Sequence, residues 1–246
     1  MRTPGNRFYL FDTGKEDELL LSQMRALGVD TLQAVFLSHP DFDHFASLSA
    51  LIGKFPIRKV YLPPDSSPDQ TWQSLMKKLE LLPIQRDTLF AGDTMLWDGG
   101  VNVRVLWPAK YSAVRGNNVS LVMRVDYAGH GVLLTGDVQD SAEAAILATQ
   151  VHFGSDILKV AHHGSRSSSS LPFLAAVAPR WAVISCDSNA YGHPHPETLI
   201  GLRRILGDPA AILRTDKEGA IGFVIDHDGP RRIRAEDMSL SWTKGF

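Results

Sequence analysis

Short runs rich in β-branched residues alternate with amphipathic stretches along almost the whole of this chain, which restricts it to the α/β class of folds. The alternation is interrupted only in the middle, where expected strands follow one another with glycine-containing turns between them. Such a run is typical of an antiparallel meander. Its strands are expected at residues 94–97, 101–107, 120–127 and 131–135.

Blocks of mixed strand and helix flank the meander on both sides. Strands are expected there at residues 7–11, 32–37, 58–62, 157–160, 181–185, 211–214, 222–225 and 231–234. Helices are expected at residues 17–27, 48–55, 68–82, 141–149, 171–177 and 196–206, with Ser67 as the N-cap of the third. No Ser/Gly linker or charge run divides the blocks, so we predict one α/β domain over residues 1–246.

Composition excludes several other classes of protein. A hydrophobic content of 44% and a formal net charge of -2 exclude intrinsic disorder, and the near-neutral charge disfavours a protein that coats nucleic acid. The sequence contains neither a signal peptide nor an apolar run of the roughly 18–20 residues that span a bilayer. We therefore expect a soluble chain that makes no membrane contact itself.

The single cysteine, Cys186, excludes an intramolecular disulfide and a cysteine-based zinc knuckle. It stands in an apolar run, and we expect it to be buried in a strand.

The densest group of metal-binding side chains follows the strand expected at residues 32–37. His39, Asp41, Asp43 and His44 lie within six positions, and imidazole and carboxylate are donors that zinc, manganese and iron accept. A turn there can direct His39 and Asp41 to one side and Asp43 and His44 to the other. One loop could then serve two ions. The competing interpretation is a polar loop in which Asp43 caps the next helix.

Further groups follow later strands. Asp137 ends an apolar strand after Gly136, although a Gly-Asp pair can also be a simple turn. His162 and His163 follow the strand at residues 157–160, and we expect Gly164 to let the backbone approach a ligand or metal.

The last histidine-rich segment, residues 191–196, contains His193 and His195 between prolines that stiffen the loop. A purely structural loop remains the alternative there.

In this order, the groups resemble the metallo-β-lactamase superfamily, and within it most closely the C-terminal hydrolase domain of ComEC-type DNA-internalisation competence proteins. The phrases that carry the resemblance are residues 11–14, 38–44, 117–122, 134–137, 159–165, 191–196 and 214–216 with 219–220. The implied fold is an αβ/βα sandwich with the metal site at one edge between two sheets.

The resemblance also implies roles for individual residues. His39 and Asp41 would bind one metal ion, Asp43, His44 and His163 the other, and Asp137 would bridge the two. Asp12 would brace the metal loop through hydrogen bonds. The residues that would face the reacting substrate are His162, His193 and Asp137 in catalysis, and Asn118, Ser165 and His195 in substrate binding.

The cofactor implied is a pair of divalent ions, zinc or manganese, with iron also compatible with the donors. A hydroxide held between them would attack phosphorus, and a protonated His162 or His193 would donate to the leaving oxygen.

The chain departs from the family pattern at two points of the site. The third histidine is missing, and the corresponding stretch offers Asn117, Asn118 and Ser120, so the first ion would be held weakly or completed by water. The usual Gly-Gly after the metal loop is Ala46-Ser47, which alters helix packing there.

A third departure concerns the start of the chain. The strand at residues 7–11 is not preceded by the family's Gly-Gln-Gly-Asp strand. We therefore expect a truncated chain or a late start codon, and a sheet that lacks its first edge strand. An exposed edge could pair with a second copy to give a homodimer.

The first functional hypothesis is a metal-dependent phosphodiesterase, a nuclease that acts on single-stranded DNA. The alternatives are a stand-alone hydrolase of small esters, phosphoesters or lactones, and a weakly catalytic binding module of a DNA-uptake channel. Location follows only from the resemblance: a chain excised from a ComEC-type protein would be a soluble domain of a bacterial inner-membrane protein.

Overall fold

The computed structural model describes residues 1–233 apart from residue 16, residues 65–66 and residues 188–191. A four-stranded sheet is parallel throughout and has the order β1 (Phe8–Phe11), β2 (Leu32–Phe36), β3 (Lys59–Tyr61), β4 (Gln85–Asp87). A seven-stranded sheet has the order β11 (Ile212–Arg214), β10 (Trp181–Ile184), β9 (Ile157–Lys159), β8 (His130–Leu134), β7 (Val122–Tyr127), β6 (Val101–Trp107), β5 (Thr94–Trp97). A hairpin of β12 (Gly222–Asp226) and β13 (Gly229–Ile233) follows.

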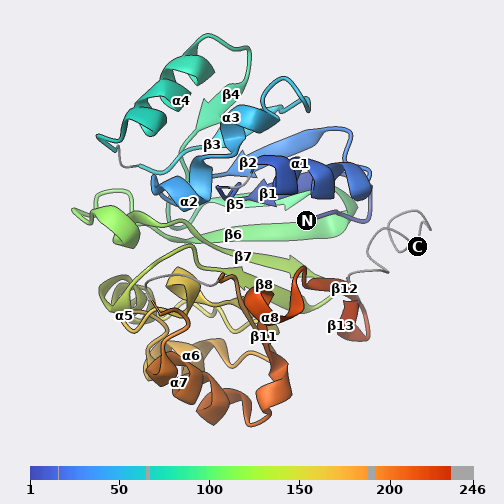
Figure 1. The fold of residues 1–246 in the computed structure, drawn as a ribbon. Coiled ribbons are helices and arrows are strands. Elements are labelled where there is room, and N and C mark those ends of the chain that lie inside the picture. Colours follow the sequence, from blue (N-terminus) through green and yellow to red (C-terminus); the bar gives the residue numbers. More distant parts are fainter. Residues whose placement is uncertain (16, 65–66, 188–191, 234–246) are drawn as a thin grey trace.

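Helices cover the outer faces of the two sheets (Figure 1). Those on the four-stranded sheet are α1 (Asp17–Ala26), α2 (Phe42–Phe45), α3 (Leu48–Leu51) and α4 (Gln70–Glu80). Those on the seven-stranded sheet are α5 (Asp140–Ala148), α6 (Leu171–Val177) and α7 (Pro196–Leu206). The short α8 (Thr215–Glu218) follows β11, and four 3-10 turns complete the described elements: η1 (Asp98–Gly100), η2 (Gly116–Val119), η3 (Ala161–Gly164) and η4 (Pro209–Ala211).

The alternation of side chains along each strand builds this layering. In β2, Val35 packs into the core beneath the helices, whereas Ala34 and Phe36 pack into the core between the sheets. In β7, Val122 packs on the α5–α7 side and Met123 faces the inter-sheet core. The result is an αβ/βα sandwich with a separate apolar layer between its sheets, which confirms the predicted fold class.

The central meander is confirmed as well, because β5, β6, β7 and β8 pair antiparallel in sequence order. Beyond β8 the seven-stranded sheet becomes parallel through β9, β10 and β11. The expected helix at residues 48–55 is wrong in length, since α3 ends at Leu51.

Some details of the expectations are wrong. Asp69, not Ser67, caps α4, because its carboxylate accepts the backbone N–H groups of Thr71 and Trp72. Cys186 lies beyond the end of β10 and is partly exposed, not buried in the strand.

The outer edge of β1 is partly covered by the first residues of the chain. Arg2 forms an antiparallel bridge with Phe8, and the N–H of Tyr9 donates to the carbonyl of Met1 at 2.9 Å. Dimerisation through this edge stays a prediction. So does the extent of the domain over residues 1–246, because Arg234 and the rest of residues 234–246 lie outside the described part. Among the described residues, no helix is both long and apolar enough to cross a membrane.

Candidate metal centre

The candidate site is assembled where several strands end at one edge of the sandwich. Asp12 follows β1, the metal loop (residues 38–44) follows β2, Asp137 follows β8, and His162 and His163 follow β9. Parallel strands bring their carboxyl ends to the same edge of a sheet. Groups spread over about 150 residues of sequence therefore meet in space.

His39, Asp41 and Asp137 form one half of the centre. His39 Nε2 lies 3.4 Å from Asp41 Oδ2 and 4.0 Å from Asp137 Oδ2. His39 is fully buried, and its Nδ1 lies 3.1 Å from Ser38 Oγ, so Nε2 is the atom presented to the centre.

Asp43, His44 and His163 form the other half. His163 Nε2 lies 3.3 Å from Asp43 Oδ2 and 3.4 Å from Asp137 Oδ2. His44 Nε2 lies 3.3 Å from both Asp137 Oδ2 and His163 Nε2. The structure thus brings the five expected ligands together around Asp137, with His44 near both His39 and His163. Their division between two metal ions stays a prediction.

The polar atoms of this cluster suit a cation. His39 Nε2 and Asp137 Oδ1 are buried and have no hydrogen-bond partner among the described residues. Leaving such atoms unsatisfied in a protein interior is costly. Coordination of a divalent ion by imidazole nitrogens and carboxylate oxygens would satisfy both, and this donor set fits zinc, manganese or iron.

Without a metal, protons hold the cluster together. Burial lowers the pKa of His44, but the carboxylates of Asp12 and Asp137 outweigh it and raise this pKa to about 10. Burial also lowers the pKa of His163, but hydrogen bonds to Asp137 and Asp43 outweigh this effect and raise the pKa to about 9. The hydrogen bond from His163 lowers the pKa of Asp43 to about 2. Both imidazoles are therefore protonated near neutral pH and neutralise the carboxylates that a cation would otherwise neutralise.

A carboxylate and a backbone carbonyl orient these imidazoles. His44 Nδ1–H donates to Asp12 Oδ2 at 2.8 Å, and His163 Nδ1–H donates to the carbonyl of Ser185 at 2.6 Å. Each ring is thereby turned so that Nε2 faces Asp137. Asp12 also accepts from the N–H and hydroxyl of Ser38 at 2.7 and 2.8 Å, so it braces the start of the metal loop as expected.

We expect Asp12→Asn to weaken metal binding by about 10- to 100-fold, because the amide no longer holds the His44 ring by a charge-assisted bond. Competition against a chelator of known affinity measures the effect, and Asp30→Asn, on the exposed surface, is the control. Unchanged affinity in a folded Asp12→Asn protein would contradict the bracing role.

Gly136 explains how the Asp137 segment packs against the metal loop. Its backbone has φ +52°, and a Cβ there would lie 2.8 Å from both Ser38 Cβ and Ser120 Cβ. Both neighbours belong to the site's framework, since Ser38 bonds Asp12 and the hydroxyl of Ser120 accepts the N–H of Asp137 at 3.0 Å. Only glycine permits this close approach.

Gly136→Ala should therefore lower the free energy of unfolding by about 2–4 kcal/mol, combining a left-handed backbone with overpacking. Gly28→Ala is a matched control, because Gly28 has φ +66° but open space around it, and should cost only about 1 kcal/mol. Urea unfolding measures both, and equal losses would show that the packing contact is unimportant.

Gly164 packs against the loop that carries His193. A Cβ at Gly164 would lie 2.6 Å from Pro194 Cβ, and the carbonyl of Gly164 accepts the N–H of His195 at 2.8 Å. Gly164 thus makes room for this loop, and its approach to a ligand or metal stays a prediction. Tyr191, in the same segment, lies outside the described residues.

The structure places His162 and His193 together at the rim of the centre. Their rings lie 5.5 Å apart, and His162 Nε2 is 4.0 Å from Asp137 Oδ2. His162 and His163 both have left-handed backbones, with φ +49° and +54°, which residues other than glycine rarely adopt. Such strain is typical of functional sites.

The three expected substrate-binding residues have other partners in this structure. The amide of Asn118 exchanges hydrogen bonds with Gln139, and Ser165 Oγ lies 3.2 Å from Ser167 Oγ. His195 is the N-cap of α7 and accepts the N–H of Glu197. Their contact with substrate stays a prediction, and the structure gives each a structural role, which the sequence offered as an alternative only for the loop that carries His195.

The sequence indicated no contact for two residues at the site: it gave Lys159 no role and named Asn117 only in the stretch that replaces the family's third histidine. Asn117 Nδ2 lies 3.1 Å from His162 Nε2, at the position where the family's third histidine was sought. Lys159, at the end of β9, contributes a positive charge that helps to lower the pKa of Asp12 and of Asp137, and its Nζ lies 3.5 Å from the carbonyl of Gly136. The only signal for either was its place beside a metal-binding phrase.

The comparison with known proteins agrees with this geometry. Residues 2–188 match the metallo-beta-lactamase superfamily, so the chain belongs to it and has the fold of a metal-dependent hydrolase. The structure of the metallo-beta-lactamase fold protein YhfI from Bacillus subtilis matches with a TM-score of 0.52 and 15% identity over 85% of each chain, which shows the shared fold.

More particular relatives lie among ComEC-type competence proteins. Competence protein ComA of Neisseria gonorrhoeae is 31% identical over 97% of this chain and 32% of its own length. ComE operon protein 3 of Bacillus subtilis is 27% identical over 84% of this chain and 26% of its own length. The chain thus spans about a quarter to a third of the curated relatives that it matches.

Proposed function

We propose that this chain hydrolyses phosphodiester bonds with two divalent cations, and that its substrate is single-stranded DNA. The observation that carries the proposal is the convergence of His39, Asp41, Asp43, His44 and His163 on Asp137, together with the unsatisfied buried atoms His39 Nε2 and Asp137 Oδ1. The relatedness to a competence protein supports DNA as the substrate.

Each half of the cluster would hold one cation. His39 and Asp41 would bind the first, Asp43, His44 and His163 the second, and Asp137 both. When bound, a pair of such cations makes water acidic enough to supply hydroxide near neutral pH and offsets charge on a phosphoryl group. The first half has fewer imidazoles, because the stretch that would supply another provides Asn117 and Ser120 instead.

His162 and His193 would then position the substrate. Burial lowers the pKa of both imidazoles. Each is therefore neutral near pH 7 in the free protein and presents one N–H group. The protonated donor expected from the sequence is disfavoured until a phosphate brings negative charge beside these rings. Proton donation to the leaving oxygen would thus follow substrate binding.

The experiment pairs elemental analysis of the purified protein with a substrate panel. The panel contains bis(p-nitrophenyl) phosphate, a labelled single-stranded oligonucleotide and a lactone. We expect bound divalent metal and turnover of both phosphodiesters. Turnover of the lactone alone would replace the proposal by a small-molecule hydrolase, and bound metal without any turnover would favour a binding module.

A further inference from the structure

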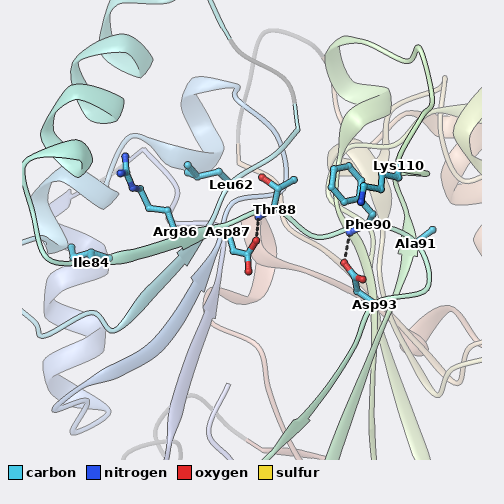
Figure 2. A pocket seen from close by; sticks show the side chains of 9 residues that line it. All are labelled: Leu62, Ile84, Arg86, Asp87, Thr88, Phe90, Ala91, Asp93 and Lys110. Atoms are coloured by element: carbon cyan, nitrogen blue, oxygen red, sulfur yellow. Dashed lines mark hydrogen bonds between the residues drawn. The ribbon is translucent and has the colours of Figure 1, made fainter.

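A groove of about 810 Å³ is lined by residues that take no part in the metal centre. Its walls include Leu62, which follows β3, and Arg86, which lies in the edge strand β4. Two loops contribute Phe90 and Lys110. Figure 2 shows Arg86 on the β4 side and Phe90 with Lys110 on the opposite side.

The groove lies at the same edge of the fold as the metal centre. β2, β3 and β4 are parallel neighbours, so the carboxyl ends that carry His39, Leu62 and Thr88 follow one another along this edge. Neighbouring strands are about 4.8 Å apart, which places the groove within about 10 Å of the metal loop in the direction of the sheet.

The loop that carries Lys110 provides a second connection. It is held against the other wall, because the N–H of Ala91 donates to the carbonyl of Pro108 at 2.8 Å. It then continues through Tyr111, whose side chain is 92% exposed, to Asn117 beside His162. The loop therefore connects one wall of the groove to the segment that carries Asn117, next to His162.

The charge around the groove is net positive by one, because Arg86, Lys110 and the Lys59 that pairs with Asp87 outnumber the carboxylates of Asp87 and Asp93. Asp87 pairs with Lys59 at 2.9 Å, and the carboxylate of Asp93 accepts the N–H of Phe90 at 2.8 Å. No carboxylate in the described part of the chain forms an ion pair with Arg86 or Lys110. Lys110 Nζ instead lies 5.9 Å from the centre of the Phe90 ring.

We propose that this groove binds single-stranded nucleic acid, with Arg86 and Lys110 contacting phosphates and the Phe90 ring stacking on a base. Cations that follow the backbone beside an aromatic ring are the usual means of holding single strands. The inference rests on the proposed phosphodiesterase activity, because that activity is the reason for a bound strand to extend from the groove to the metal centre. It adds the place at which a polymeric substrate is held.

The test measures binding of an oligothymidylate of about 20 nucleotides, with phosphorothioate linkages that resist hydrolysis, to the full metal-loaded chain. The double variant Arg86→Gln, Lys110→Gln should bind at least about tenfold more weakly at about 50 mM salt. Its slope of log affinity against log salt should fall by about 1.4, because about 0.7 is lost for each phosphate contact. Arg25→Gln with Lys54→Gln removes the same charges from α1 and the loop after α3 and should change neither value.

Phe90→Leu separates stacking from charge. It keeps an apolar side chain, and it should weaken oligothymidylate binding by about tenfold while leaving the salt slope unchanged. Equal binding by the double variant and the wild-type protein would overturn the groove proposal. An equally large loss of binding in the control pair would also overturn it, because the loss would then come from the net charge of the protein and not from the groove.

Hydrolysis of bis(p-nitrophenyl) phosphate distinguishes this proposal from the preceding one. It should be unchanged in all these variants, since the small substrate does not reach the groove. Weakened oligonucleotide binding without turnover of any phosphodiester would uphold the groove and reject the phosphodiesterase. Turnover of a phosphodiester by the wild-type protein, with unchanged oligonucleotide binding by the double variant, would uphold the phosphodiesterase and reject the groove.

Discussion

Asp137→Ala is expected to abolish hydrolysis of bis(p-nitrophenyl) phosphate, with turnover at least about 10³-fold lower than in the wild-type protein. Asp137 Oδ2 lies between 3.3 and 4.0 Å from an Nε2 atom of His39, His44, His162 and His163, so one carboxylate joins both halves of the centre. Its removal should also lower the metal content below two ions per chain.

The control variants separate loss of the site from loss of the fold. Asp137→Asn keeps the shape of the buried side chain and should also be inactive, with the wild-type circular dichroism spectrum. Asp228→Ala, in the exposed turn of the β12–β13 hairpin, should retain full activity. His39→Ala should match Asp137→Ala. A fully active, metal-loaded variant at either position would refute the assignment of the site.

The second large effect concerns pH. In metal-free protein the pKa values of His44 and His163 stand at about 10 and about 9, above the ordinary value near 6.5 that the unfolded chain has. Stability from these protons is fully present below about pH 6.5 and is lost as the pH rises toward 9 and 10. The free energy of unfolding should fall by roughly 2–3 kcal/mol per pH unit between about pH 7 and 9, since the fold retains up to two extra protons and each contributes about 1.4.

Carboxylates determine how the free energy of unfolding changes at acid pH. The pKa values of Asp12, Asp43 and Asp137 lie below their usual range, so their stabilisation is present above about pH 4 and is lost on further acidification. Urea unfolding with a chelator present should show a maximum between these limits. A flat profile between about pH 7 and 9 would contradict the protonated cluster.

Added metal should reverse the alkaline trend. A cation at Nε2 of His44 and His163 must displace their protons, so metal affinity should rise by up to about 100-fold per pH unit in this range. Calorimetry in buffers of different ionisation enthalpy would count the protons released.

The sequence was most informative where a local pattern alone decides the structure. The metal loop and the alternation of β2 are local, and the four side chains of residues 39–44 lie together at the end of β2. The pairing of β5 with β6 and of β7 with β8 followed from short glycine turns, which leave little choice of partner, whereas residues 108–121 join β6 to β7.

The features that were missed depend on contacts distant in sequence. β4 consists of the exposed residues Gln85, Arg86 and Asp87 and has no apolar alternation, so only its pairing with β3 defines it as a strand. The need for glycine at 164 comes from Pro194, thirty residues away, and cannot be seen in the phrase around it.

The same limit applies to the missing histidine. The η2 segment supplies an amide at Asn117, and Ser120 follows it with a hydroxyl that holds the backbone of Asp137. The family pattern shows that a histidine is absent from this segment. The roles of the residues that replace it depend on where β7 and β8 place them in the fold.

The most direct measurement is anomalous X-ray scattering from crystals grown with excess manganese. The account predicts two scattering maxima, one bounded by His39, Asp41 and Asp137 and the other by Asp43, His44 and His163. Crystals in which these side chains surround no maximum, or in which manganese binds only elsewhere, would contradict it.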